Sequence, residues 1–300
     1  MVYSKHAEER PSLVGQIVDG GALLLLETLG AGAYGTVYRA LELHSDNGTQ
    51  RAVKVLEKPR LDRRTAKFHA RELQLHTLVS GLPGILPLHR HFEDEHHIFV
   101  VLALVAGGDL HARITQGHVF WRNDELVRDA LLQLTDALGA CHARGVYHRD
   151  VKPENILCSA DGRTLWLADF GLASVDQVST SHGCGSGHYM APEVIGREFA
   201  GRTPYLTRGA DVWALGVVLV NIVAGRSPWR RALLRDPGFE HFVDDPDYLR
   251  TVLPISEACN ELVNRACCID PLERISMREF REEILKVDTF FMSEEELEEA

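Results

Sequence analysis

The segment His-Arg-Asp-Val-Lys-Pro-Glu-Asn at residues 148–155 constrains this chain more than any other stretch. It follows Gly145, which ends a helical pattern, and precedes a strand-like run, so we expect a loop. Its side chains suit one chemistry. The carboxylate of Asp150 takes the proton of an attacking hydroxyl, Lys152 holds a phosphoryl group in transfer, and the amide of Asn155 holds a metal. The alternative is a buried turn that only joins a helix to a strand, but so many specified residues in one segment favour the functional interpretation.

A second carboxylate follows in Asp-Phe-Gly at residues 169–171, directly after the apolar run Leu-Trp-Leu-Ala. Mg²⁺ prefers oxygen ligands and commonly bridges protein carboxylates and phosphates. Asp-Phe-Gly alone could be any turn, but its position behind the loop at 148–155 favours a functional role. We therefore expect Asp169 and Asn155 to hold Mg²⁺.

Residues 29–38 read Leu-Gly-Ala-Gly-Ala-Tyr-Gly-Thr-Val-Tyr. Gly-x-Gly-x-x-Gly alone is a weak signal, because dinucleotide-binding turns share its spacing. The residues after Gly35 are β-branched and aromatic, which is typical of a strand, whereas a dinucleotide-binding turn opens a helix. A hairpin with Gly30, Gly32 and Gly35 at its tip lets backbone N–H groups approach the phosphates of ATP closely.

Together these motifs resemble the eukaryotic protein kinases, and Lys152 and Ser186 match the serine/threonine type. The matched positions run from Gly30 to Arg274, nearly the whole chain. The resemblance implies an α+β, bilobal protein kinase fold, with a small β-rich N-lobe that carries helix C and a larger, mainly α-helical C-lobe. We expect a lead-in at residues 1–20, a kinase domain at 21–287 (N-lobe about 21–104, C-lobe about 105–287) and an acidic tail at 288–300.

The resemblance also implies roles for individual residues. Lys54 would contact the α- and β-phosphates of ATP, and Glu72 of helix C would pair with Lys54. Asp150 and Lys152 would complete the catalytic set. MgATP would lie between the lobes, with its adenine edge on main-chain groups of residues 103–105. The residues implied to contact the nucleotide are Leu29, Gly30, Gly32, Gly35, Val37, Ala52, Lys54, Leu102, Ala103, Val105, Asp109 and Leu157.

Other positions support this arrangement or depart from it. Apolar periodicity predicts helix C at residues 65–79, and the resemblance places Phe170 beneath it. His76 stands where many relatives carry an aliphatic residue, and Ala103 stands where an acid is common. Asp211 would begin a buried helix and brace the backbone of the catalytic loop.

Two further relationships are implied by the resemblance. Glu193, in Met-Ala-Pro-Glu, would pair with Arg274 far along the chain. Ser186 stands where threonine is usual, and we expect it to hydrogen-bond Asp150 and Lys152.

His182 occupies the position where many relatives have a phosphorylated threonine, although Arg149 remains to receive a phosphate. Two hypotheses follow. Activity does not need phosphorylation at this position, or Ser179, Thr180 or Ser181 is phosphorylated instead.

The resemblance gives an incomplete indication of the substrate. Asp109 and Glu154 occupy positions that read basic residues upstream of the target, but a third such position is Asn221 rather than an acid. We expect protein substrates with Ser or Thr and a partial preference for basic residues. Residues 228–256 are more loosely similar to a fungal subfamily of serine/threonine kinases tied to nutrient signalling and the control of meiosis.

Composition narrows the class of protein. With 45% apolar and 25% charged residues the chain is typical of a soluble globular protein, and its net charge of −11 argues against nucleic-acid binding. The longest apolar run, at residues 213–224, is too short to span a membrane, and no apolar signal region begins the chain. The six cysteines form no C-x-x-C pair, so we expect reduced thiols. We expect a cytoplasmic or nuclear monomer without a membrane partner.

Two other classes of protein fit the residues less well than a kinase, and one further site lacks support. A non-catalytic, ATP-binding pseudokinase conflicts with the complete catalytic and metal-binding set. A small-molecule phosphotransferase conflicts with Lys152 and with Ala-Pro-Glu at 191–193, which shapes a platform for a peptide. A metal site among His89, His91, His96 and His97 has no supporting spacing, and a solvated hairpin tip accounts for them better.

Overall fold

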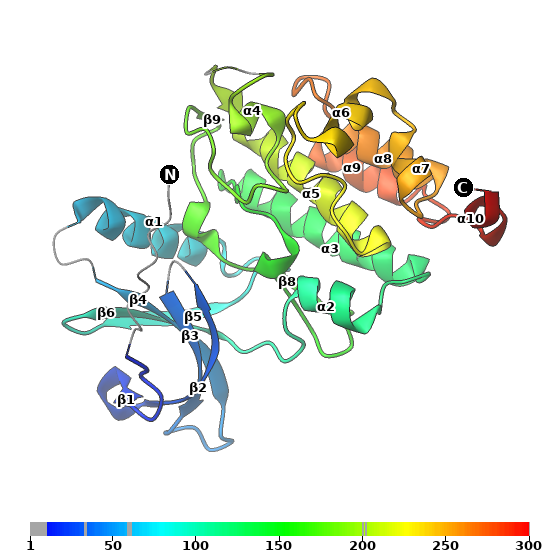
Figure 1. Cartoon of the computed structure of the whole chain (residues 1–300). Coiled ribbons are helices and arrows are strands. Elements are labelled where there is room, and N and C mark those ends of the chain that lie inside the picture. Colours follow the sequence, from blue (N-terminus) through cyan, green and yellow to red (C-terminus); the bar gives the residue numbers. More distant parts are fainter. Residues whose placement is uncertain (1–10, 33–34, 59–61, 200, 202, 300) are drawn as a thin grey trace. The chain divides into compact units, whose positions relative to one another are not determined.

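Figure 1 shows the computed structural model, which describes residues 11–32, 35–58, 62–199, 201 and 203–299. The chain forms two compact units, which are described separately. The first unit contains the described residues up to His69 together with Pro87–Leu104. The second unit contains Ala70–Leu86 and the described residues from Val105 onward. Residues 1–10 of the expected lead-in lie outside the described residues.

The first unit is built on a six-stranded sheet with the strand order β1-β2-β3-β4-β6-β5, in which every neighbouring pair is antiparallel. Burial alternates at the start of the second strand, as expected for a sheet with one face in a core: Leu23 and Leu25 are fully buried, whereas Leu24 is half-buried. Tyr38 and Phe99 fill the same core. The strands are β1 (Ile17–Val18), β2 (Leu23–Gly32), β3 (Gly35–Glu42), β4 (Gln50–Glu57), β5 (Leu88–Glu93) and β6 (His97–Ala103).

The glycine-rich segment forms the β2–β3 hairpin, in which Gly32 pairs with Gly35. The strand predicted after Gly35 is confirmed as β3, which removes the dinucleotide-binding alternative. Gly35 has φ +145°, and a Cβ added there would lie 2.3 Å from the carbonyl oxygen of Val55 on β4. Only glycine fits this backbone crossing.

The second half of the expected lead-in belongs to the sheet. Ile17 pairs with Leu24 across β1 and β2, and the side chain of Leu13 is buried in the core of the first unit. The mixed, polar composition of this segment gave no strand signal because only two residues pair.

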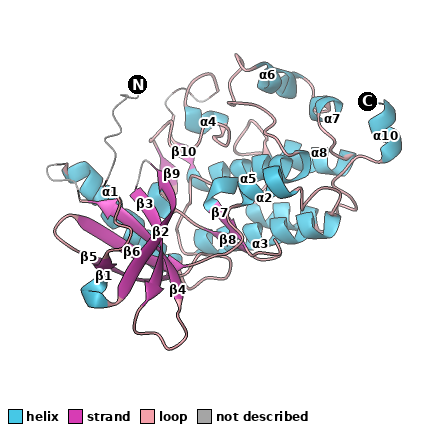
Figure 2. Ribbon diagram, turned by 60° about the horizontal axis from the view of Figure 1, so that its bottom comes forward, coloured by secondary structure: helices cyan, strands magenta, loops and turns pink. Residues whose placement is uncertain are grey.

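The helix predicted at residues 65–79 is confirmed as α1 (Arg63–Val79), which contributes residues to both units. Within the second unit, Leu75 and Val79 of this helix join the core. Since strands and helices are largely segregated along the chain, the α+β class is also confirmed (Figure 2).

The second unit is mainly helical, with two short hairpins (Figure 2). Its hairpins are β7 (Ile156–Cys158) with β8 (Leu165–Leu167) and β9 (Val178–Ser179) with β10 (Tyr205–Leu206). Its helices are α2 (Leu110–Gly117), α3 (Asp124–Ala143), α4 (Pro192–Ile195), α5 (Thr207–Ala224), α6 (Pro237–Asp244), α7 (Tyr248–Val252), α8 (Glu257–Ala266), α9 (Met277–Ile284) and α10 (Glu294–Glu299).

α5 is the central helix of the second unit's core. It begins at Thr207, so the expectation that the helix starts at Asp211 was wrong by one turn. By length and composition its 18 residues could cross a membrane, but 78% of them are buried inside the protein, as in a core helix. Trp213 of this helix packs against the aromatic rings of Trp229 and Phe239.

The acidic tail is tied to the second unit rather than free. Phe290, Phe291 and Met292 are buried, and the Glu294 and Glu296 carboxylates of α10 pair with Arg122 and Arg250 at 2.7 and 3.0 Å. α10 itself is a helix with mostly exposed side chains, in agreement with the charge pattern of the tail, and the buried residues just before it anchor this end. All six cysteines are free, as the sequence predicted.

Candidate active site

The loop at residues 148–155 lies between α3 and β7 and ends in a 3₁₀ turn, Pro153–Asn155. The expected brace is confirmed: Asp211 Oδ2 accepts the His148 N–H at 2.9 Å, and Asp211 Oδ1 accepts the Arg149 N–H at 2.7 Å. Arg149 has φ +66°, an unfavourable conformation that these hydrogen bonds hold in place.

His142 also contacts Asp211, which no sequence motif predicted. His142, in the last turn of α3, places Nε2 2.8 Å from Asp211 Oδ2. Burial by itself would raise the pKa of Asp211, but the hydrogen bonds from His142 and the Arg149 amide outweigh burial and hold this pKa below its ordinary value. Asp211 is therefore a charged brace inside the core.

Asp150 sits in a fixed network of donors. Its Oδ1 accepts the Ser186 hydroxyl at 2.8 Å, and its Oδ2 accepts Lys152 Nζ at 2.7 Å and Asn155 Nδ2 at 3.1 Å. Lys152 Nζ also donates to Ser186 Oγ at 2.8 Å. The expected contacts of Ser186 with both residues are therefore confirmed. The arrangement fixes a carboxylate beside a cation, which can orient a hydroxyl and stabilise negative charge transferred near it.

Asn155 and Asp169 are brought together by the backbone. The Ala168 N–H donates to the Asn155 carbonyl at 2.8 Å, which places the residue before Asp169 against the catalytic loop. Asn155 Nδ2 also donates to the Asp150 carbonyl at 2.9 Å, so the amide group is held with its two protons directed at Asp150. The Asn155 Oδ1 and the Asp169 carboxylate are oxygen groups of the kind that Mg²⁺ prefers, and their role as its ligands stays a prediction.

Phe170 lies between two histidines of the second unit. Its ring centroid is 4.9 Å from that of His148 and 4.9 Å from that of His76 on α1, which confirms the expected packing of Phe170 on this helix. His76 is buried, and its Nε2 lies 2.8 Å from the Leu86 carbonyl. Glu72, one turn earlier, is buried close to Gly171: a Cβ there would lie 3.5 Å from Glu72 Oε2.

One face of the first unit's sheet gathers residues expected at the nucleotide. Val37 of β3 pairs with Lys54 of β4, and Ala52 pairs with Leu102 of β6. Since residues two apart in a strand and residues directly opposite in neighbouring strands share a face, these four side chains lie on the same side of the sheet. Leu29, Gly30, Gly32 and Gly35 belong to the β2–β3 hairpin, and Ala103 ends β6.

The remaining nucleotide residues belong to the second unit. Asp109 caps α2 by accepting the Ala112 N–H at 2.7 Å, and it forms an antiparallel bridge with Leu157 of β7. Val105 is half-buried just before it. The roles of these residues and of the sheet residues at a nucleotide stay predictions.

No metal site appears at the histidines near β5 and β6. Within the ranges that the structure describes, no group of three or more His, Cys, Asp or Glu side chains could hold a metal ion. His97 instead places Nδ1 3.4 Å from Asp94 in the hairpin turn.

The pair of Glu193 and Arg274 is confirmed as a buried, bidentate salt bridge. Arg274 Nη1 and Nη2 lie 2.6 and 3.0 Å from the two Glu193 oxygens, and the guanidinium stacks 5.0 Å above the Trp213 ring. Arg274 also donates to the carbonyls of Gly209 and Cys268, so its charge is fully compensated.

Comparison with known proteins agrees with this geometry. The protein kinase domain family matches residues 24–285. The chain is 41% identical over 289 residues to the negative regulator of sexual conjugation and meiosis of Schizosaccharomyces pombe, over 90% of this chain and 61% of that protein. It is 34% identical over 282 residues to the serine/threonine-protein kinase ksp1 of the same organism, over 90% and 58%.

A third relative, the serine/threonine-protein kinase VHS1 of Saccharomyces cerevisiae, is 28% identical over 330 residues, over 89% of this chain and 70% of that protein. The chain thus spans about 60% of the length of the two S. pombe relatives. Since the family match covers most of the sequence and its relatives are named as serine/threonine kinases, the chain belongs to the protein kinase domain family, on its serine/threonine branch.

Proposed function

We propose that this chain transfers the γ-phosphoryl group of MgATP to Ser and Thr hydroxyls of protein substrates in intracellular signalling. The observation that carries the proposal is the network of Asp150, Lys152 and Ser186, because it fixes a carboxylate and a cation where a hydroxyl can be oriented. Phosphoryl transfer needs little covalent chemistry from the protein, so positioning and charge neutralisation provide most of the rate.

Each residue of the site has its own role in this proposal. Asp150 Oδ1 or Oδ2 accepts a hydrogen bond from the substrate hydroxyl and takes up its proton, while the new bond to the γ-phosphorus forms and the bond from that phosphorus to the leaving ADP breaks. Lys152 Nζ stabilises the transferred group, and Lys54 holds the α- and β-phosphates of the nucleotide. Asn155 and Asp169 would hold Mg²⁺, which neutralises phosphate charge when bound.

Substrate preference follows from acidic side chains of the second unit. Glu154 is exposed and Asp109 is half-buried, with one carboxylate oxygen of Asp109 accepting the α2 cap hydrogen bond. Asn221 Oδ1 accepts the Tyr189 hydroxyl at 2.8 Å, so its side chain belongs to the interior. The exposed Glu154 and the half-buried Asp109 support a partial preference for basic residues near the target. We further propose a monomeric, cytoplasmic or nuclear protein without a nucleic-acid or membrane partner, on the net charge of −11 and the composition of the chain.

The test is phosphorylation of a degenerate Ser/Thr peptide library with MgATP, using wild type and Asp150→Asn. Transfer by wild type that is lost in Asp150→Asn and on removal of Mg²⁺ with EDTA would support the proposal. Enrichment of proline or acidic residues around the target would contradict the basic preference. ATP-dependent thermal stabilisation without transfer by either protein would instead indicate a pseudokinase.

A further inference from the structure

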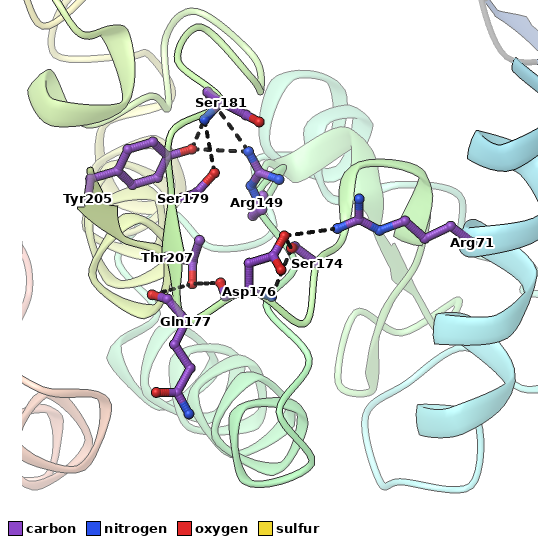
Figure 3. Close-up of polar contacts among 9 residues, drawn as sticks. All are labelled: Arg71, Arg149, Ser174, Asp176, Gln177, Ser179, Ser181, Tyr205 and Thr207. Atoms are coloured by element: carbon purple, nitrogen blue, oxygen red, sulfur yellow. Dashed lines mark hydrogen bonds and ion pairs between the residues drawn. The ribbon is translucent and has the colours of Figure 1, made fainter. Parts of the chain in front are cut away.

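Residues 174–183, which lead from Asp-Phe-Gly toward Ser186, are held within the second unit mainly by backbone and hydroxyl hydrogen bonds, together with an ion pair of 3.9 Å between Arg71 and Asp176 (Figure 3). Ser174 and Tyr147 exchange backbone hydrogen bonds of 2.8 and 2.9 Å. The buried Thr207 hydroxyl donates to the carbonyls of Asp176 and Gln177 at 2.7 and 3.0 Å. Beyond these points β9 pairs with β10, with Ser179 opposite Tyr205.

Tyr205 lies at the centre of the next contacts (Figure 3). Its hydroxyl donates to the Ser181 carbonyl at 3.0 Å and accepts a hydrogen bond from Arg149 Nη2, also at 3.0 Å. Arg149 Nη2 reaches the same Ser181 carbonyl at 3.4 Å. Tyr205 is only 4% exposed, so water competes little for its hydroxyl. One phenol thus bridges the guanidinium of the catalytic loop and the backbone of Ser181.

His182 secures the following residue. Its ring centroid lies 5.5 Å from that of Tyr205, and its Nδ1 lies 3.1 Å from the Glu193 carbonyl. The ring packs over Gly196, where an added Cβ would lie 2.5 Å from His182 Nδ1. The Gly183 N–H then donates to the Val194 carbonyl at 2.7 Å. His182 therefore occupies its site as a packed side chain.

These contacts are connected to the Asp150 carboxylate in two ways. Arg149 directly precedes Asp150, and its backbone approaches Gly185, where an added Cβ would lie 2.9 Å from the Arg149 carbonyl oxygen. Gly185 in turn precedes Ser186, which donates to Asp150. A displacement of Ser181 or His182 would therefore move both sides of the Asp150 network.

We propose that Tyr205 and His182 are positioning residues that hold Ser186 and Asp150 in the reactive arrangement without phosphorylation of Ser179, Thr180 or Ser181. The inference rests on the proposed kinase activity and identifies how that site is kept ordered. It selects the first of the two hypotheses raised by the histidine at position 182.

The alternative is that a phosphate on residues 179–181 orders this segment, and the structure shows groups to which such a phosphate could bind. Arg149 Nε and His182 Nε2 are buried without a hydrogen-bond partner in the part of the chain that the structure describes. The side chains of Thr180 and Ser181 are exposed, and a phosphate on either could supply an acceptor. Ser179 is buried, and its hydroxyl already accepts the Ser181 N–H at 3.1 Å, so it is the least accessible of the three.

The experiment compares wild type, Tyr205→Phe, Thr180→Ala/Ser181→Ala and the matched control Tyr248→Phe, all treated with phosphatase and verified by intact mass. Tyr248 packs on His241 away from this segment, so its variant loses a hydroxyl without touching Arg149. We expect the unphosphorylated wild type, the double variant and the control to share one kcat. In Tyr205→Phe we expect kcat to fall about tenfold with the KM for ATP unchanged, because one hydrogen bond to a charged group is lost.

A second measurement is independent of activity. Hydrogen exchange should be faster at residues 181–183 in Tyr205→Phe than in wild type, while the melting temperatures of the two proteins stay close. A wild type that is active only after phosphorylation at 179–181, or a Tyr205→Phe variant with unchanged kcat and unchanged exchange, would overturn the proposal. A wild type that transfers no phosphate in either phosphorylation state would instead overturn the proposed kinase function.

Discussion

The Ser186 hydroxyl donates to Asp150 Oδ1 and accepts from Lys152 Nζ, each at 2.8 Å, so one small side chain joins the two residues that we propose carry out phosphoryl transfer. Ser186→Ala removes the hydroxyl, so that Asp150 loses a donor, Lys152 loses an acceptor, and both side chains are free to reorient. We expect kcat to fall by about ten- to a hundredfold, because hydrogen bonds to charged groups contribute about 1.5–3 kcal/mol. Ser186→Thr keeps the hydroxyl and should remain within a few-fold of wild type. Equal losses in both variants, measured by steady-state peptide phosphorylation, would argue against this role.

The buried pair of Glu193 and Arg274 predicts a large stability effect. Arg274→Ala leaves the Glu193 carboxylate buried and uncompensated, which should lower the free energy of unfolding by about 3–5 kcal/mol. Arg281, which pairs with Asp136 at 2.7 Å on the surface, provides the matched control. Arg281→Ala should cost about 1 kcal/mol or less. Urea denaturation of both variants measures the difference, and comparable losses would contradict the predicted role of burial.

Gly35 predicts a local defect in the first unit. In Gly35→Ala the new Cβ would meet the Val55 carbonyl oxygen at 2.3 Å in a backbone conformation that alanine rarely adopts. We expect destabilisation of about 1–3 kcal/mol, seen as a lower melting temperature and faster hydrogen exchange in β3 and β4. Gly30→Ala has no atom within 4 Å of the added Cβ and should leave stability nearly unchanged. A Gly35→Ala protein as stable as Gly30→Ala would show that the hairpin relaxes freely.

His69 predicts a pH dependence of stability. Burial lowers the pKa of His69, and the positive charge of Lys54 lowers it further below the ordinary value of 6.5. The unfolded chain then binds a proton at a higher pH than the folded protein does. The contribution of His69 to stability is therefore complete above about pH 6.5 and decreases as the pH falls from there toward the lower folded-state pKa.

The comparison is between wild type and His69→Gln, which cannot titrate. Between about pH 7.5 and about pH 5.5, wild type should lose more of its free energy of unfolding than the variant does. Chemical denaturation at several pH values provides the measurement. Parallel curves for the two proteins would show that His69 is not protonated on unfolding.

The sequence was most informative where function requires specified residue types at fixed spacing. Asp150, Lys152 and Ser186 were expected together and lie within hydrogen-bonding distance, and the braces from Asp211 and from Glu193 to Arg274 were also expected. These contacts could be predicted because each needs a particular charged or hydrogen-bonding side chain, which few other residue types can replace. The strand after Gly35 followed from a local preference for β-branched and aromatic residues.

The features that sequence reasoning missed depend on tertiary contacts between ordinary residues. Tyr205 and His142 carry no local signal, because a tyrosine in a short strand or a histidine in a last helical turn is common without any such role. β1 escaped detection because two residues are too few to show alternation. The start of α5 at Thr207 was missed because its first turn, Thr-Arg-Gly-Ala, lacks the large apolar residues that mark the rest of the helix.

Asp211 receives hydrogen bonds from the backbone of the catalytic loop and contacts His142 of α3, so the same carboxylate supports the fold and aligns the chemistry. Replacement of Asp211 would leave the His142 side chain and two backbone N–H groups without their hydrogen-bond acceptor. The catalytic loop at residues 148–155 would then be less well ordered. Inside a cell, where partly unfolded chains are removed by chaperones and proteases, such a variant would be seen first as scarce protein. A survey that measures only the abundance of variants would therefore classify Asp211 as a residue needed for folding, although it also orients the loop that carries Asp150.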